Sequence, residues 1–196
     1  LTGVLGMVLK FLLILIYVFL FLINRDKFKK FILEYVDQDH KEEANVILRD
    51  TKKVAHKYLW GRIQVMLILG VMYLITFTAF GLEHTALLVI FGVIVTIIPY
   101  IGPFISGLLP ILFMIVFGGT TTEIVIFSII VLIIQLIESY VLEPLIIGAE
   151  VKQSPIFIII AIILGGSIWG TAGLILFVPF FGIMNIIFDH TPDLKP

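Results

Sequence analysis

The sequence predicts an all-α fold: a polytopic transmembrane helical bundle with broken or re-entrant short helices and one amphipathic cytoplasmic helical linker. Composition is the first reason, because 60% of the residues are hydrophobic and 14% are charged, whereas a soluble domain is about 45–50% apolar and about 25% charged. Charge placement is the second reason. Ten of the thirteen Lys and Arg residues lie between Arg25 and Arg62, which leaves long, almost uncharged runs elsewhere. We therefore expect a multi-pass integral membrane protein.

The N-terminal part divides into a span and a linker. Residues 1–23 form an apolar run broken only by Lys10, and about 20 apolar residues are enough to cross a membrane as a helix. Residues 24–61 follow as a basic amphipathic linker, in which Phe28, Phe31 and Tyr35 recur at helical spacing. Its Lys and Arg residues predict a cytoplasmic location, with a solvated linker that only sets orientation as the alternative. Because the chain begins at Leu1 rather than Met, we interpret it as part of a longer protein.

Residues 62–190 are expected to form the transmembrane core, beginning with an apolar run at 63–80. Between Glu83 and Glu123 the chain carries no Lys, Arg, Asp or Glu, and a helix of that length would measure about 58 Å, nearly two membrane thicknesses. The chain must therefore turn. We expect a hairpin at 99–103, whose short arms fit either a re-entrant hairpin or two tilted spans. The residues expected to form this turn and to line a cavity with their backbone are Pro99, Tyr100, Gly102 and Pro103.

The C-terminal part predicts a further span and a second break. Residues 121–142 form an apolar run that Glu143 and Pro144 are expected to close. A second hairpin is expected at 165–173, where glycines act either as hinges or as close-packing positions, and a proline further along predicts a kink. These hinge or packing residues are Gly165, Gly166, Gly170, Gly173 and Pro179. Residues 191–196 are expected to be a polar tail.

Three polar residues are candidates for a transport site. Gln135, Glu138 and Ser139 follow one another at spacings of three and four, which predicts one shared helix face. A carboxylate deep in lipid costs about 2.5–3.5 kcal/mol, so Glu138 is expected to face the bundle interior, either protonated or paired. Such a group can exchange a proton or a cation. The alternative is a structural carboxyl group near the membrane interface, since Pro144 follows closely.

Motifs typical of enzymes are missing from the sequence. It contains no H-E-x-x-H zinc motif, no G-x-S-x-G nucleophile elbow and no glycine-rich phosphate loop followed by Lys. The chain has no cysteine, which excludes disulfides and thiolate metal sites. We therefore expect a protein that is not an enzyme and that uses no metal or cofactor.

Several segments together resemble the autoinducer-2 exporter family of bacterial permeases, also called the PerM family. The resemblance covers roughly residues 60–188 and rests on the order and spacing of its pieces. These pieces are the run IPYIGP at 98–103 with Pro110, then Gln135 with Glu138, the run LEPLIIG at 142–148, Ser154 with Pro155, and Gly165 and Gly166 followed by Gly170, Gly173 and Val178 with Pro179.

The resemblance implies a multi-pass protein of the bacterial inner membrane that exports a small solute, driven by the proton motive force or by diffusion. Autoinducer-2 is the namesake substrate of that family, and sodium/proton antiport is reported for some relatives. Members are longer and carry further N-terminal spans. As candidate functional positions the resemblance carries over only Glu138, Gln135 and the turn at 99–103.

Three functions stay open at this point. The first is the export of a small solute, the second is sodium (cation)/proton antiport centred on Glu138, and the third is a non-transporting structural or assembly role. Transport is favoured because broken, charge-bearing segments are costly in a merely structural bundle. The expected partners are the lipid bilayer and a small solute or a cation and proton. A homo-oligomer is left open, and nucleic acid is not expected.

Overall fold

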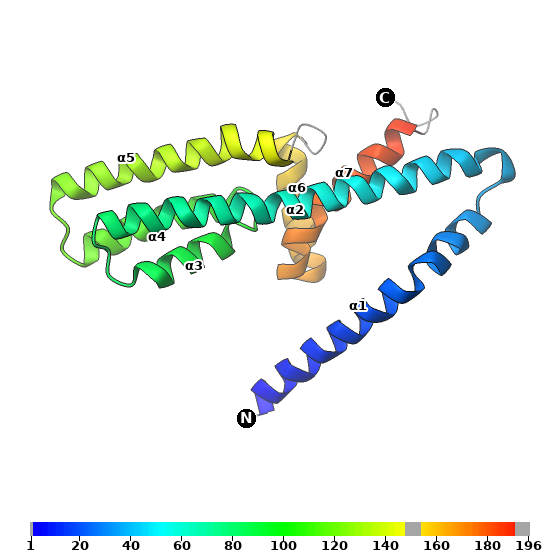
Figure 1. Cartoon of the computed structure of the whole chain (residues 1–196), viewed down its shortest axis with the longest axis horizontal. Helices are drawn as coiled ribbons and strands as arrows, with labels where there is room; N and C mark the ends of the chain where they lie inside the picture. Colours follow the sequence, from blue (N-terminus) through cyan, green and yellow to red (C-terminus); the bar gives the residue numbers. More distant parts are fainter. Residues whose placement is uncertain (1, 148–153, 191–196) are drawn as a thin grey trace. The chain divides into compact units, whose positions relative to one another are not determined.

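The structure is a computed structural model that describes residues 2–147 and 154–190 (Figure 1). Over these residues the chain is helical without any strand, which confirms the predicted all-α class. Three segments are long and apolar enough to cross a membrane: Val8–Glu34, Gln38–Ala79 and Thr121–Ile147. The tail expected at 191–196 lies outside the described residues. The elements in order are α1 (Thr2–Glu34), η1 (Gln38–His40), α2 (Lys41–Ala79), α3 (Thr85–Val95), α4 (Ile101–Val116), α5 (Thr121–Ile137), η2 (Glu138–Ile147), α6 (Pro155–Trp169) and α7 (Thr171–His190).

The chain separates into two compact units, residues 1–49 and 50–196. In the first unit, α1 is one continuous helix of 33 residues, about 50 Å long. It does not end at residue 23, as expected, but runs through the first basic residues to Glu34. Large apolar side chains are exposed along most of its length, and the rings of Phe21 and Phe28 lie 5.2 Å apart across the expected boundary. A helix that is apolar around its circumference suits a lipid environment.

Helix α2 contains 39 residues, about 58 Å, against a hydrocarbon core of about 30 Å. Its N-terminal half carries most of its Lys and Arg residues and extends beyond such a core. Its C-terminal half buries a stripe at spacings of three and four residues, the repeat that places side chains on one helix face. The side chains of this stripe that have no exposed surface are Val65, Leu69, Tyr73 and Phe77. The apolar run at 63–80 therefore lies within a longer helix.

Aromatic rings join α2 to α5 in the core of the second unit. Phe77 stacks on Tyr73 with ring centroids 5.3 Å apart, and it lies 5.7 Å from Phe127 of α5. Phe80, at the end of α2, meets the same Phe127 ring edge-on at 5.2 Å. Helix α3 packs against α4, and α4 packs against α5. These contacts hold the C-terminal half of α2 alongside α4 and α5 (Figure 1).

The first break of the core lies earlier than the sequence indicates. The helical hydrogen bonding stops after Val95 and resumes at Ile101, so Gly102 and Pro103 already belong to the first turn of α4. This differs from the expected break at 99–103, and the reason is that a proline in the first turn of a helix removes an amide that has no helical acceptor. The backbone amides in and after the turn find partners within it, for example Gly102 N–H with the Ile98 carbonyl at 2.8 Å.

The fourth predicted span continues past its expected end. Residues 138–147 form η2, a π-helical segment that carries on directly from α5 and contains Pro144. The expectation that Glu143 and Pro144 close the helix is therefore wrong. A π-helix closes its turns with bonds from residue i to i+5, which gives the chain an alternative to the α-helical bond that proline disrupts.

The second break is a single turn between α6 and α7. Gly170 forms it with a φ of 60°, a left-handed conformation that glycine adopts at no steric cost. Gly165 and Gly173 lie inside the two helices, and a Cβ on either residue would collide with the backbone of the other. Gly166 faces Leu174. Pro179 is buried within α7, which continues to His190. The hairpin thus has one hinge glycine and a tight small-residue contact.

Candidate functional site

A buried polar network joins α2, α4 and α5. The Gln135 side-chain amide donates to the Tyr73 hydroxyl at 2.9 Å and to the Ser106 hydroxyl at 3.3 Å. Those two hydroxyls also share a hydrogen bond of 3.1 Å. Tyr73 has no exposed surface and Ser106 is 1% exposed. Three helices therefore contribute one polar group each to a place from which water and lipid are excluded.

Two features of α4 bring its backbone close to this network. The Ser106 hydroxyl lies 3.1 Å from the Pro103 carbonyl, to which it donates within its own helix. Gly107 follows, and a Cβ there would stand 3.1 Å from the Gln135 amide nitrogen. A larger residue at Gly107 would therefore press on the glutamine. The glycine explains how Gln135 reaches two hydroxyls that come from different helices.

A charged cluster lies next to this network, beginning at Glu138, one helical turn after Gln135. Arg62 of α2 donates to Glu143 of η2 at 2.5 Å. Its second terminal nitrogen is 3.7 Å from Glu138, an ion-pair distance that is too long for a hydrogen bond. The side chain of Arg62 is 4% exposed, that of Glu138 is 0% exposed and that of Glu143 is 38% exposed. One guanidinium group is thus shared unequally between a buried and a half-exposed carboxyl group.

The π-helical segment explains how one arginine reaches both carboxyl groups. Glu138 and Glu143 are five residues apart, and in an α-helix that spacing would separate their directions by roughly 140°. In a π-helix, residues five apart are joined by a turn of hydrogen bonding and lie on nearly the same side. Irregular helix turns of this kind occur often at functional sites. The unusual helix therefore sets the geometry of the cluster.

Close backbone packing brings Arg62 into this position. The preceding residue, Gly61, faces the end of η2, where a Cβ would stand 3.1 Å from the Ile147 side chain and 3.3 Å from the Ile147 Cα. A small residue at this point allows α2 and η2 to approach closely. Arg62 then lies beside η2 rather than pointing along the surface of α2.

Several polar atoms of these residues are buried without a hydrogen-bond partner among the described residues. Both carboxyl oxygens of Glu138 are in this state, as are Nε and the second terminal nitrogen of Arg62. The carbonyl oxygen of Gln135 and the hydroxyl of Tyr58 are the other two. Buried polar groups are normally satisfied, and each exception carries a desolvation cost of about 1–3 kcal/mol or more for charged groups. The six atoms belong to four residues, and each could form a further hydrogen bond.

The structure brings some of the candidate residues together and separates others. Gln135 and Glu138 both belong to the buried region, which we call the polar cluster: Tyr58, Arg62, Tyr73, Ser106, Gln135, Glu138 and Glu143. Ser139 is exposed, which corrects the expected shared face of three polar residues. The reason is angular, since Ser139 lies about 100° around the helix from Glu138, and the buried stripe of α5 runs through Glu138 itself.

The turn at 99–103 contributes to packing rather than to the polar cluster. Gly102 is buried, and a Cβ there would collide with the backbone of Val95 and Thr96. Tyr100 is 51% exposed and has a φ of 62°. The glycine is therefore needed for the close approach of two chain segments, and its role in lining a cavity stays a prediction.

Five members of the polar cluster are not among the candidates that the sequence predicts: Tyr58, Arg62, Tyr73, Ser106 and Glu143. Arg62 is the first residue of the expected transmembrane core, directly after the basic linker, and Tyr73 belongs to the apolar run at 63–80. A signal did exist, because Tyr58, Arg62 and Tyr73 fall on the same helical stripe as the apolar residues between them. A charged residue on an apolar stripe is expected to find a buried partner.

Comparison with known proteins decides the family. The model of a family described as "AI-2E family transporter" matches residues 1–193 of the chain. The chain belongs to the AI-2E transporter family. This confirms the resemblance drawn from the 98–103, 142–148 and glycine motifs, and it makes the protein a member of a family of multi-pass membrane transporters.

Curated relatives carry names of the same kind. The chain is 30% identical over 162 residues to "Putative transport protein YrrI" of Bacillus subtilis (strain 168), an alignment that covers 83% of this chain and 45% of that protein. It is 29% identical over 192 residues to "Putative transport protein YueF" of the same organism, covering 96% of this chain and 52% of that protein. The chain thus spans about half the length of these relatives.

Proposed function

We propose that the protein is a secondary transporter that exports a small polar solute and couples this export to the protonation of Glu138. The single observation that carries the proposal is the position of Arg62. It donates to Glu143 and stays 3.7 Å from Glu138, which leaves the fully buried carboxyl group with two unsatisfied oxygens. One guanidinium facing two carboxylates leaves these three side chains with a net charge of −1 when both carboxyl groups are ionised. A proton on Glu138 removes that imbalance.

Proton uptake and release by Glu138 would then be linked to the rearrangement of Arg62. With Glu138 neutral, Arg62 has one charged partner, Glu143. With Glu138 ionised, two carboxylates compete for the same guanidinium, and low-dielectric surroundings make that competition strong. Intramembrane ionisable groups in transporters act as proton relays on this principle. The proton motive force is therefore the proposed energy source.

The neighbouring polar network supports a solute that carries hydroxyl groups. Gln135, Tyr73 and Ser106 offer an amide and two hydroxyls within hydrogen-bond distance of one another. The Gln135 carbonyl oxygen is buried without a partner, so it is available to accept a hydrogen bond. A site built to hydrogen-bond a hydroxyl group discriminates strongly against analogues that lack it.

Cation/proton antiport is the second candidate, and the same charge imbalance favours it. A small monovalent cation such as sodium can replace the proton beside Glu138, because hard cations take oxygen ligands and both oxygens of this carboxyl group are unsatisfied. The two candidates differ in what moves against the proton. In the first it is a neutral or polar solute, and in the second it is sodium itself.

Flux through the full-length protein in proteoliposomes tests both candidates. A pH gradient is imposed, and the movement of a furanose-type sugar and of radioactive sodium is followed in parallel with internal pH. Solute export that collapses the pH gradient supports the leading proposal, and sodium movement that does so supports antiport. If an imposed pH gradient drives neither flux, proton coupling is refuted.

The variant Glu138→Gln sharpens the test, since it keeps size and hydrogen bonding but fixes the neutral state. We expect it to lose coupled flux and the dependence of flux on pH. Glu42→Gln, which removes an exposed carboxyl group near the start of α2, is the matched control and should behave like the wild type. Wild-type rate and pH dependence in a folded Glu138→Gln protein would make Glu138 a structural residue.

The orientation proposed for α2 places its basic N-terminal half in the cytoplasm, following the bias of Lys and Arg. The chain contains no cysteine, so single cysteines report on each side. Asp37→Cys and Thr122→Cys both occupy exposed positions. A membrane-impermeant thiol reagent should label Thr122→Cys in intact cells and Asp37→Cys only after the cells are opened. The reverse pattern would overturn this orientation.

A further inference from the structure

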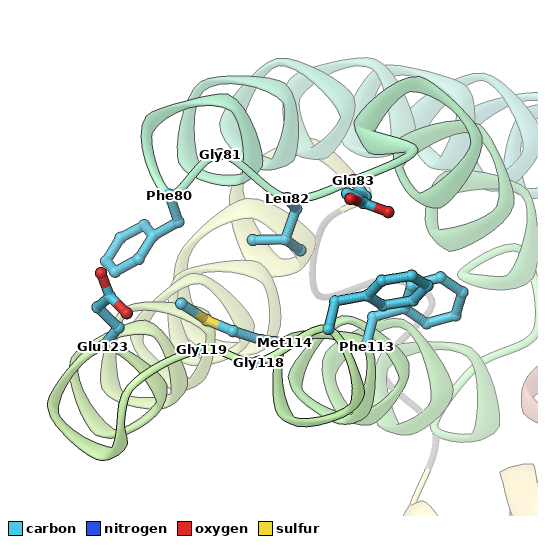
Figure 2. A pocket seen from close by; sticks show the side chains of 10 residues that line it. Phe80, Gly81, Leu82, Glu83, Phe113, Met114, Gly118, Gly119 and Glu123 are labelled. Carbon is cyan, nitrogen blue, oxygen red and sulfur yellow. The ribbon is translucent and has the colours of Figure 1, made fainter.

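A separate pocket lies at the end of α2 remote from its basic half, about 27 Å along the helix from Arg62. It is an open pocket lined by the loop from α2 to α3, the last turn of α4, the loop from α4 to α5 and the first turn of α5 (Figure 2). Its volume is about 210 Å³. A cavity of about 150 Å³ is large enough to bind benzene, so this pocket accepts a substituted ring. Its lining residues are Phe80, Gly81, Leu82, Glu83, Phe113, Met114, Phe117, Gly118, Gly119 and Glu123.

The walls of the pocket combine polar atoms with aromatic and polarisable side chains. Phe113 and Phe117 stack with ring centroids 5.4 Å apart, and the Phe117 ring meets the edge of His84 at 6.4 Å. Phe80 and Met114 supply another ring and a thioether. Aromatic faces attract cations through their quadrupole, by about 0.5–1 kcal/mol at exposed sites, and thioethers adapt to irregular apolar groups. These walls suit a ligand that is both apolar and positively charged.

Carboxyl groups stand at two ends of this pocket. Figure 2 shows Glu83 and Glu123 on opposite sides of Leu82 and Met114. In the cap of α5, Glu123 accepts from the Thr120 amide at 2.8 Å and from the Thr120 hydroxyl at 2.7 Å, both through Oε2. Oε1 stays outside this cap. The carboxylate is thus fixed in place while one oxygen remains for a ligand.

The charge around the pocket is not balanced by basic residues of the same region. No Lys or Arg occurs from residue 63 to residue 151, and His84 is the one basic side chain of the two loops. A concave surface that carries negative charge and lacks Lys and Arg concentrates cations and disfavours anions. The electrostatic potential of the pocket therefore favours a positively charged ligand.

The loop backbone keeps the pocket open. Gly81 and Gly118 have φ values of 64° and 85°, and His84 adopts a φ of 57°. At Gly119 a Cβ would stand 2.9 Å from the Met114 side chain, so a larger residue would displace a wall of the pocket. The shape thus depends on conformations that favour glycine and exists before any ligand arrives.

We propose that this pocket binds a small organic ammonium ion, with its apolar group against Phe80, Phe113 and Phe117 and its charge between Glu83 and Glu123. A line of ring contacts, Tyr73 to Phe77 to Phe127 to Phe80, connects the polar cluster with the pocket wall. Phe77 and Phe127 have no exposed surface, so this line of ring contacts runs through the buried core. Ammonium binding itself does not depend on the transport role of Glu138.

Equilibrium binding to the full-length protein in lipid nanodiscs tests the proposal. The probe is radiolabelled benzyltrimethylammonium, displaced by unlabelled choline or by its neutral isostere 3,3-dimethylbutan-1-ol. We expect choline to displace the probe and the neutral alcohol to need a concentration at least about fivefold higher, because it gains neither ion pairing nor cation–π attraction. Equal potency of the two competitors would overturn the proposal.

Two carboxyl variants locate the site. Glu83→Gln and Glu123→Gln should each weaken probe binding by about fivefold, and the double variant by more. Glutamine at position 123 can still cap α5, so the fold should persist, as a melting temperature equal to that of the wild type would verify. Glu42→Gln removes a carboxyl group elsewhere and should leave binding unchanged. Unaltered binding in a folded double variant would refute the site. Because binding is measured without flux, its outcome is distinct from that of the transport test.

Discussion

The polar cluster and the hairpin of α6 and α7 interrupt regular apolar helices in opposite ways. At the polar cluster the irregular element η2 carries two carboxyl groups toward Arg62, and six polar side-chain atoms are buried without a hydrogen-bond partner among the described residues. In the hairpin, residues 154–188 contain no Lys, Arg, Asp or Glu, and the helices meet through the backbones of Gly165 and Gly173. The first irregular segment places charged side chains in the interior. In the second, glycines without side chains bring two helix backbones into contact.

A broken helix is therefore not by itself a sign of a binding site. Glycine allows α6 and α7 to pack closely, so their association depends on shape. The polar cluster depends on charge balance, since its groups are desolvated and incompletely paired. The two regions should therefore respond to different kinds of substitution, and the following experiments test that separation in order of expected effect on stability.

Removing the shared cation should have the largest effect. Arg62→Ala leaves Glu138 buried without any positive neighbour among the cluster residues, and breaking a buried ion pair in this way costs about 3–5 kcal/mol. The free energy of unfolding of the full-length protein in mixed detergent micelles measures this. The double variant with Glu138→Gln should recover part of the loss, because it removes the uncompensated charge. Two losses that simply add would contradict the charge-balance argument.

Adding one methyl group to the hairpin should have the next largest effect. In Gly173→Ala the new Cβ meets the Gly165 backbone, which cannot move aside as a side chain would, and overpacking of this kind costs about 1–3 kcal/mol. The loss of stability is measured as a lower melting temperature, followed by the helical circular dichroism signal. Gly6→Ala is the control, because no atom lies within 4 Å of its added Cβ. Equal stability of the two variants would disprove the tight contact.

Replacing the central amide tests whether the polar network is chiefly structural. Gln135→Leu removes two donated hydrogen bonds, but Tyr73 and Ser106 still bond to each other, and an unsatisfied carbonyl disappears with the glutamine. We expect a change in unfolding free energy of about 1 kcal/mol or less together with a large loss of solute flux. A stability loss as great as that of Arg62→Ala would identify the network as a folding element instead.

The smallest effect is expected at the half-exposed end of the cluster. Glu143→Gln leaves a hydrogen-bond acceptor for Arg62, and its side chain is 38% exposed, so the stability change should stay within about 1 kcal/mol. The guanidinium is then free to move closer to Glu138. Flux should consequently show a shifted pH dependence, measured beside Glu138→Gln in the same liposomes. Identical pH profiles for wild type and Glu143→Gln would separate Glu143 from coupling.

How far the sequence predicts this molecule differs between its elements. The all-α class and the burial of the Glu138 carboxyl group follow from hydropathy and spacing. The exact end of a helix does not, because α1 crosses its expected boundary and η2 continues through Pro144. A proline rules out one hydrogen bond, but it does not rule out a wider turn.

The sequence predicts only two of the seven residues of the polar cluster. Gln135 and Glu138 lie on one face of one helix, and periodicity finds such residues. Arg62, Tyr73 and Ser106 come from two other helices, so their approach depends on the packing of α2 and α4, which spacing along the chain does not encode. The sequence shows that positions 61 and 107 are glycines, but it does not show which residues of other helices they contact. Those contacts allow the helices to approach one another closely.

The π-helical turn also gives the chain a sensitivity to length. Deleting one residue between Glu138 and Glu143, for example the exposed Tyr140, would place the carboxyl groups four apart, the spacing at which an ordinary α-helix already aligns them. The charged pair could then survive a deletion that most buried helices would not tolerate. The residues that follow, from Pro144 to Ile147, would shift by one position along the helix and would contact Gly61 differently. A one-residue deletion at this point therefore keeps the two carboxyl groups on nearly the same side of the helix, while it changes the packing of the residues that follow.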